Sequence, residues 1–178
     1  MNHARVILDT LDGFLTQPVE LTLFGRAALQ LGFPAPPAEY AQSLDVDAVL
    51  WTGQAESLRD QTNFWSALDQ TNEALAPRGL YISHLFEDAQ VVLTPEWRSQ
   101  RMPIAGPWRQ LQVFRLGDGD LLLSKLMRYD PLDLEDARFI IAATGWDRAT
   151  VRSWIQRARV PPLAEIREQF EQCSAEFS

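Results

Sequence analysis

The segment that most limits what this chain can fold into is residues 43–50, SLDVDAVL, because it has a β-strand pattern and yet carries two aspartates. Successive strand residues point to opposite faces, so Asp45 and Asp47 share one face and the apolar residues share the other. Aspartate is a poor strand former, and like charges on one face repel. The two carboxylates therefore indicate either a ligand pair for a cation or a charged edge strand that resists aggregation.

Short strands and helices alternate along the first two thirds of the chain. We predict strands at residues 19–24, 44–51, 80–84, 90–93 and 110–116, and helices at 4–15, 26–31 and 55–76. Proline-rich or irregular loops are expected at 33–40 and 94–109. After residue 118 only helices are expected, at about 121–128, 131–144 and 148–158, with a last helix after Pro162. The pattern predicts an α+β fold, with a core at 1–117 and a helical subdomain at 118–178.

The composition excludes several classes of protein. The chain has 178 residues, of which 46% are hydrophobic and 22% are charged, which favours a packed globular domain. No apolar run approaches the roughly 20 residues of a membrane span, and no basic region precedes an apolar run at the N-terminus. The single cysteine, Cys173, cannot form an internal disulfide. We therefore expect a cytoplasmic protein that does not enter a membrane.

The charge distribution is uneven. The net charge of −8 argues against a general nucleic-acid binder. Residues 1–97 hold 4 arginines against 13 acidic residues, whereas residues 98–178 hold 12 basic against 11 acidic residues. The second half could therefore contain a local anion site or simply a mixed, solvated surface. Lys125 is the only lysine among the 16 basic residues, and marks a position where a compact ammonium could matter.

Several other acidic residues have a structural interpretation. Asp118 or Asp120 can cap the helix at 121–128, and Asp130 followed by Pro131 is typical of a helix start. Asp133 would complete a capping box with Asp130. Further acidic residues that could act chemically are Asp136, which is equally suited to the first turn of a helix, and Glu87 and Asp88, which are equally suited to a turn between strands.

Two neighbouring segments together favour phosphate chemistry. The strand at 19–24 ends at Gly25, and a helix follows, so a phosphate could approach backbone N–H groups at the start of the helix. Asp45 and Asp47, about 7 Å apart along their strand, could converge on one Mg²⁺ ion that also binds substrate phosphates. A cation, a phosphate cradle and an acidic pair are what phosphoryl or nucleotidyl transfer requires.

Three segments of this chain resemble nucleotidyltransferase-like domains of bacterial proteins, which are related to abortive-infection toxins. The segments are LTLFGRAALQLGF, SLDVDAVL and LLLSKLMRYDPLDLEDARFII, and they span about residues 21–141. In that family a strand ends in Gly-Gly or Gly-Ser, a small-residue helix and an Asp-x-Asp strand follow, and a lysine-bearing helix and Asp-Leu-x-Asp come later. The resemblance implies a polymerase-β-like nucleotidyltransferase fold with a mixed β-sheet flanked by helices.

The resemblance also assigns roles to individual residues. Asp45 and Asp47 would hold Mg²⁺ and act in catalysis, and Gly25 would lie against the phosphates of a nucleoside triphosphate. Lys125 and Arg128 could reach the nucleotide. The acceptor would be a nucleic acid such as tRNA or a protein, and the protein would act in a toxin–antitoxin or phage-defence system, with a partner protein or as a homodimer.

Two departures from the family pattern leave an alternative open. Arg26 stands where the family has its second small residue, and could bind phosphate or block the cradle. The third carboxylate of active members has no clear counterpart among the acidic residues of this chain. The alternative is a catalytically degenerate domain that serves as a binding or interaction module. Trp97 or Trp108 could stack on a base in either case.

Overall fold

The computed structural model describes residues 2–177, except for the side chain of His84. The chain forms an α+β fold with a mixed sheet and a helical C-terminal region, as the sequence predicts. It divides into two compact units. Unit 1 contains the residues up to Glu87 and Met102–Arg115, and unit 2 contains Asp88–Arg101 and the chain from Leu116 onward. Segment 88–101 thus belongs with the helices that follow Leu116.

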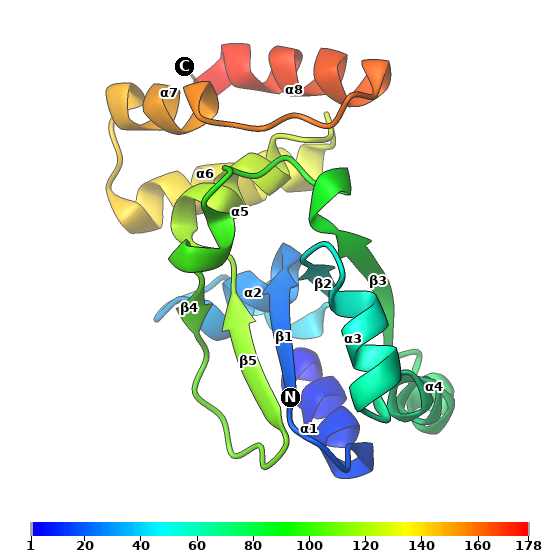
Figure 1. Cartoon of the computed structure of the whole chain (residues 1–178). Coiled ribbons are helices and arrows are strands. Elements are labelled where there is room, and N and C mark those ends of the chain that lie inside the picture. The colour runs from blue at the N-terminus through cyan, green and yellow to red at the C-terminus, as the bar shows by residue number, and fades with distance from the viewer. Residues whose placement is uncertain (1, 178) are drawn as a thin grey trace. The chain divides into compact units, whose positions relative to one another are not determined.

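Unit 1 is built on a five-stranded sheet in the order β3-β2-β1-β5-β4. The strands are β1 (Val19–Phe24), β2 (Asp45–Leu50), β3 (Tyr81–Glu87), β4 (Met102–Pro103) and β5 (Leu111–Arg115). In Figure 1, β3 and β4 form the two edges. β1 pairs antiparallel with β2 and parallel with β5, and β2 pairs parallel with β3. The sheet is therefore mixed, and the aspartate-bearing strand lies inside it rather than at an edge.

Helices of unit 1 supply the rest of its core. They are α1 (His3–Phe14), α2 (Gly25–Gly32), α3 (Gln54–Gln61) and α4 (Phe64–Leu75), with 3₁₀ turns at Ala38–Gln42 and Ala76–Arg78. The apolar stripe of α1 includes Ile7, Leu8 and Leu11, all fully buried, and α1 packs against α4. The buried alternate residues of β1 and β2, such as Leu21 and Val46, complete this core.

A single carboxylate fixes α1 to the start of β5. Asp12 accepts hydrogen bonds from the backbone N–H groups of Arg109, Gln110 and Leu111, at 2.8–3.1 Å. Burial by itself raises the pKa of Asp12, but these three amides outweigh it and lower the pKa. Asp12 therefore ties together segments almost 100 residues apart in the chain.

The helix predicted at 55–76 is two helices. The chain breaks between α3 and α4 at Thr62 and Asn63: Thr62 is the C-cap of α3, where its amide makes the last helical hydrogen bond to Leu58, and Asn63 is the N-cap of α4. Asn63 donates to the carbonyl of Phe14 and accepts from the amide of Thr16, while Thr62 Oγ1 accepts from the amide of Phe64. Side chains that bond locally to the backbone compete with a helix, and here tertiary partners favour the break.

The strands predicted at 80–84 and 90–93 are also different in the structure. β3 extends to Glu87, and residues Asp88–Gln90 form a 3₁₀ turn. The predicted strand at 90–93 is wrong, since within the described residues Leu93 makes only an isolated bridge to Arg159. The run Val91, Val92 and Leu93 is apolar because it is buried in unit 2, not because it joins the sheet.

A side chain covers part of the exposed edge of β3. Asn72 of α4 accepts a hydrogen bond from the Ile82 amide at 2.7 Å and donates one to the Ile82 carbonyl at 3.2 Å. Its amide thus pairs with the strand as a neighbouring strand would. Open edges template aggregation, and a helix that covers the edge is one of the ways in which proteins protect it.

Unit 2 consists of helices α5 (Asp118–Lys125), α6 (Pro131–Thr144), α7 (Arg148–Gln156) and α8 (Ala164–Phe177), with 3₁₀ turns at Asp88–Gln90 and Trp97–Gln100. As predicted, Asp130 caps α6 and Gly145, in the left-handed conformation at φ +68°, ends it. Asp147 caps α7 by accepting from the Thr150 amide. The prediction that Asp118 or Asp120 caps α5 is wrong, because Gly117 is the cap residue and both aspartates lie in the first turn.

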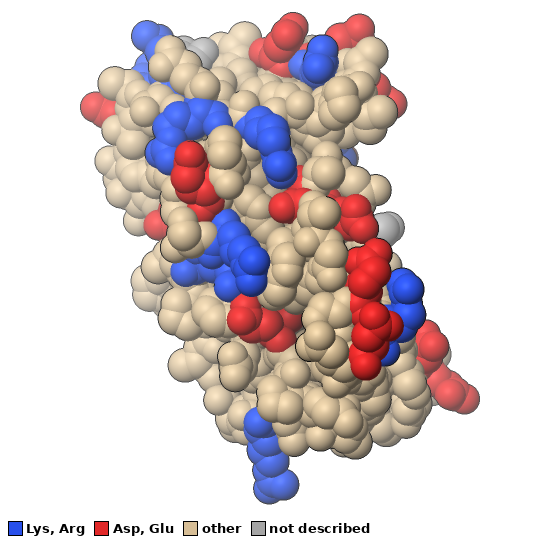
Figure 2. Space-filling view, in the orientation of Figure 1, with Lys and Arg blue, Asp and Glu red and all other residues tan. Residues whose placement is uncertain are grey.

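The surface charge is mixed. Figure 2 shows basic and acidic side chains interspersed on the face in view, with carboxylates gathered over α3. Together with the net charge of −8, this distribution does not form the continuous basic surface that a nucleic-acid backbone requires on that face. Among residues 2–177, none of the helices combines the length and the apolar character needed to cross a bilayer.

Candidate functional site

The turn from β1 into α2 places a glycine against an aspartate of the neighbouring strand. Gly25 has a φ of +72°, which favours glycine over any other residue. A Cβ atom at Gly25 would lie 3.0 Å from Asp47 Oδ2. Phe24 pairs with Asp47 across the β1–β2 ladder, so the position of the carboxylate is fixed by strand register. The absence of a side chain at Gly25 thus leaves room for a carboxylate at the start of α2.

The first turn of α2 is electrostatically suited to negative charge. Its cap residue, Phe24, makes no side-chain cap hydrogen bond. The positive end of the helix dipole therefore lies near Asp47, which stabilises the carboxylate. The same end of the helix could stabilise a phosphate group.

Asp45 and Asp47 share one face of β2, and a serine of β3 joins them. Ser83 Oγ lies 2.7 Å from Asp47 Oδ1 and 3.2 Å from Asp45 Oδ2. A hydroxyl has one hydrogen, so at these distances Ser83 donates mainly to Asp47. Ser43 donates a hydrogen bond to Asp45 Oδ1 at 3.0 Å. The two half-buried carboxylates are thus held by hydroxyl groups around one point.

A bulge in β3 lies beside this point. The register runs from Val46 opposite Ile82 to Ala48 opposite Leu85, so β3 contains one extra residue across from Asp47. Bulges re-aim side chains and are frequent beside functional sites. Next to the aspartates the same end of the sheet is apolar, with the rings of Phe24 and Phe86 in edge contact at 5.6 Å. We call Gly25, Asp45, Asp47 and Ser83 the aspartate site.

Arg26 follows Gly25 in the first turn of α2. Its guanidinium carbon lies 5.0 Å from the centre of the Tyr40 ring, a cation–π distance. The side chain is half-buried and belongs to unit 1, as the aspartate site does. Arg26 is therefore a cation that packs on Tyr40 beside the start of the helix. The nucleotidyltransferase-like sequence pattern has a small residue at this position.

Lys125 and Arg128 lie in unit 2, where carboxylates of α6 hold them. The Lys125 ammonium donates to Asp133 at 3.0 Å and to Asp136 at 2.7 Å, and only 7% of its side chain is exposed. Arg128 binds Asp133 at 2.8 Å with 65% of its side chain exposed. The expected capping box is wrong, because Asp133 binds these two cations instead. The structure brings together Gly25, Arg26, Asp45 and Asp47 in one unit, and Lys125 and Arg128 in the other.

The acidic residues considered as a third carboxylate have other partners or positions. Glu87 ends β3, and Asp88 is buried and accepts a hydrogen bond from Trp97 at 3.2 Å. Asp120 Oδ1 accepts from the Thr94 amide at 2.6 Å within unit 2. Among the described residues, no three His, Cys, Asp or Glu side chains gather as a metal site. On the neighbouring strand, Ser83 is the residue that faces both aspartates.

Ser83 of the aspartate site, and Ser43 beside it, are residues that the sequence did not indicate. Ser83 lies opposite Asp47 because it follows Ile82, the partner of Val46, but the sequence alone does not show which strand pairs with β2 or in which register. Trp97 and Trp108 belong to different units: Trp97 is buried, and Trp108 donates to Asp9. The His84 side chain lies outside the described part of the structure.

The sequence matches no protein-family model, and comparison with curated proteins and with solved structures finds no similar chain. The geometry of the aspartate site and the sequence motifs are therefore what indicate a function.

Proposed function

We propose that the aspartate site binds a nucleoside triphosphate together with Mg²⁺ and transfers its nucleotidyl group to an acceptor hydroxyl. The single observation that carries this proposal is that Asp47 lies against Gly25 at the start of α2, with Asp45 beside Asp47 across the Ser83 hydroxyl. A pair of carboxylates supplies a cation site, and a helix that starts at a glycine supplies a phosphate site next to it. The resemblance of the three sequence segments to nucleotidyltransferase-like domains supports the same function.

The donor set of the aspartate site fits Mg²⁺. Magnesium in proteins is commonly held by one or two carboxylates, with substrate phosphates and water in the remaining positions. Asp45 and Asp47 would provide the carboxylates, in place of their contacts with the Ser83 hydroxyl. When bound, the ion would neutralise charge on the phosphates during transfer. Gly25 would admit the phosphates to the α2 amides, and Arg26 would provide a bidentate cation for them.

The reaction would require an acceptor whose hydroxyl oxygen attacks the α-phosphorus while pyrophosphate leaves. We propose a nucleic-acid acceptor such as tRNA, or a protein hydroxyl, in a toxin–antitoxin or phage-defence setting, with a partner protein or a second copy of the chain. The interspersed charges favour recognition of a defined acceptor over general binding to nucleic acid.

A second candidate function is a nucleotide-binding or interaction module without transfer activity. The observation that favours it is that the side chain of β3 beside both aspartates is a hydroxyl, Ser83, and not a carboxylate that could activate the acceptor hydroxyl. In this alternative Mg²⁺ and nucleotide still bind, and their binding changes the affinity for a partner.

Isothermal titration calorimetry with ATP, GTP, CTP and UTP, each with and without Mg²⁺, tests the proposal. We expect one of them to bind only with Mg²⁺, and Asp45→Asn and Asp47→Asn each to weaken that binding by at least about tenfold. Asp60→Asn, an exposed carboxylate of α3 in the same unit, is the control and should bind as the wild type does.

A transfer assay then separates the two candidates. Label from the α-phosphate should move to RNA or protein if the site is a transferase, and Asp47→Asn should abolish the transfer. Binding without transfer would support the module. Both candidate functions are contradicted if no nucleotide binds with Mg²⁺, or if Asp45→Asn and Asp47→Asn both bind the nucleotide as well as Asp60→Asn does.

A further inference from the structure

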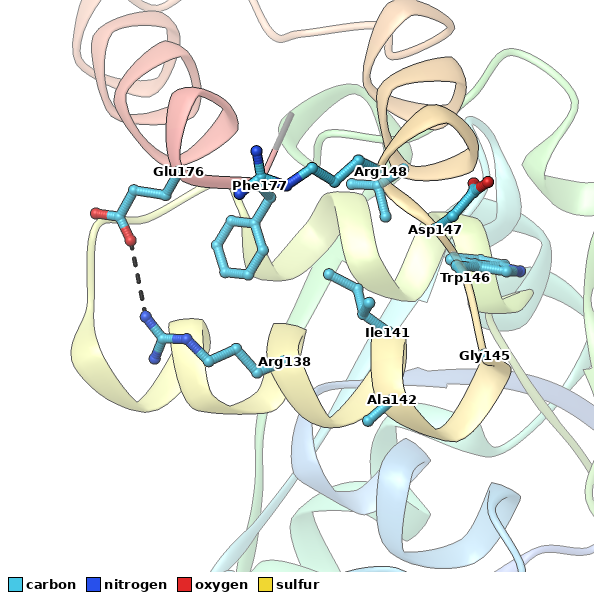
Figure 3. A pocket seen from close by; sticks show the side chains of 10 residues that line it. Arg138, Ile141, Ala142, Gly145, Trp146, Asp147, Arg148, Glu176 and Phe177 are labelled. Atoms are coloured by element: carbon cyan, nitrogen blue, oxygen red, sulfur yellow. Dashed lines mark ion pairs between the residues drawn. The ribbon is translucent and has the colours of Figure 1, made fainter.

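A cavity of about 480 Å³ lies among α6, α7 and α8 within unit 2. Its size is in the range of small-molecule sites. Figure 3 shows the side chains that line it, which come from the C-terminal half of α6, the start of α7 and the end of α8. The apolar part of its wall includes Ile141, Ala142, Val151 and Phe177. The apolar part of a ligand could therefore be buried away from water in this cavity.

The charged groups around the cavity are not equally available to bind a ligand. Asp147 accepts the Thr150 amide at 2.8 Å as the cap of α7. Glu176 accepts the Tyr129 hydroxyl at 2.5 Å and pairs with Arg138 at 3.7 Å. The Arg138 guanidinium also lies 5.8 Å from the centre of the Phe177 ring. Both carboxylates and one of the two arginines are thus engaged within the protein.

Arg148 is the remaining charge. It is exposed at the start of α7, and its side chain makes no hydrogen bond, ion pair or ring contact with any residue that the structure describes between 2 and 177. In Figure 3 its side chain extends from α7 toward the end of α8, beside the label of Phe177. A guanidinium that borders an apolar wall without a partner favours a ligand with an anionic group.

We propose that this cavity binds an amphipathic organic monoanion, an aryl or acyl carboxylate, whose apolar body contacts Ile141, Val151 and Phe177 and whose anionic group pairs with Arg148. A single charge is favoured because Arg148 alone among the two lining arginines has no partner in the described part of the chain, while Asp147 and Glu176 repel a second negative group. This site lies in unit 2 and is independent of the aspartate site.

The test compares two fluorescent probes of nearly equal shape. One is 8-anilinonaphthalene-1-sulfonate, an aromatic monoanion, and the other is N-phenyl-1-naphthylamine, which lacks the sulfonate. We expect saturable binding of one anionic probe per folded chain. Arg148→Gln should weaken binding of the anionic probe by about tenfold and leave binding of the neutral probe unchanged. Arg152→Gln, on α7 but outside the cavity lining, should change neither.

A second pair of variants tests the place of binding. Ala142→Phe fills the cavity from its exposed wall and should weaken both probes, whereas Ala143→Phe, the next residue of α6, lies outside the lining and should not. Thermal unfolding by circular dichroism checks that each variant is folded. The proposal is overturned if the anionic probe shows no saturable binding, if Arg148→Gln binds it as the wild type does, or if Ala142→Phe has no effect.

Discussion

The role of a charged side chain depends on its neighbours, as Ser83 beside the two aspartates and the carboxylates around Lys125 both show. The sequence indicates Asp45 and Asp47 as a pair on one strand face, and the structure places them so. It does not indicate Ser83, whose hydroxyl lies between them because of the register in which β3 pairs with β2. Lys125 is conspicuous in the sequence as the only lysine, but its two carboxylate partners are on another helix. Such partners come from packing that local patterns do not encode.

Lys125→Met should strongly destabilise unit 2. The substitution keeps much of the volume but leaves Asp133 and Asp136 buried without the ammonium that both contact. Removing one partner of a buried ion pair typically costs about 3–5 kcal/mol of unfolding free energy, which urea unfolding can measure. Arg128→Met is the matched control, and should cost about 1 kcal/mol or less because that side chain is mostly exposed. Equal stability of the two variants would contradict a structural role for Lys125.

Among the elements, those with strong local signals are where the sequence predicts them. The prediction is right for β1, β5 and α6. Their signals, alternation in the strands and a cap followed by proline in the helix, lie within a few neighbouring residues. The failures have non-local causes. Asn63 breaks one predicted helix into two through contacts with Phe14 and Thr16, and the apolar run 91–93 is buried in unit 2 instead of joining the sheet.

The first turn of α5 should make stability depend on pH through Asp120. Burial raises the pKa of this carboxyl, although the Thr94 amide lowers it in part, and Oδ2 has no hydrogen-bond partner in the described structure. The folded state therefore holds this proton more tightly than the unfolded state does. The resulting stabilisation is fully present below the pKa of an unfolded aspartate and is lost as pH rises through the raised pKa.

Asp120→Asn removes this dependence while keeping an oxygen that can accept the Thr94 amide. Urea midpoints of wild type and variant between about pH 4 and about pH 8 should diverge in favour of the variant as the pH rises. Asp147→Asn provides a contrast of opposite sign below about pH 4, because the Thr150 amide lowers the pKa of Asp147 and that stabilisation is lost as the pH falls. A constant difference between wild type and Asp120→Asn across this range would contradict the assignment.

At the scale of the whole molecule, the sequence predicts an α+β chain with helices collected toward the C-terminus, which the structure confirms. It does not predict that segment 88–101 belongs with the C-terminal helices. That assignment depends on long-range contacts, such as Thr94 with Asp120 and Leu93 with Arg159. For the aspartate site, the motif residues Gly25, Asp45 and Asp47 are predictable, whereas the serines that hold them and the partners of Lys125 are not.

The most direct test of the central claim is a crystal structure with Mn²⁺ and a non-hydrolysable analogue of the nucleotide that binds best in solution. Manganese takes the same oxygen ligands as magnesium and gives an anomalous signal that locates it. The account predicts an anomalous peak coordinated by Asp45 and Asp47, with the triphosphate against Gly25 and the start of α2. A bound nucleotide elsewhere in the molecule, with Ser83 still bonded to both aspartates and no metal between them, would contradict it.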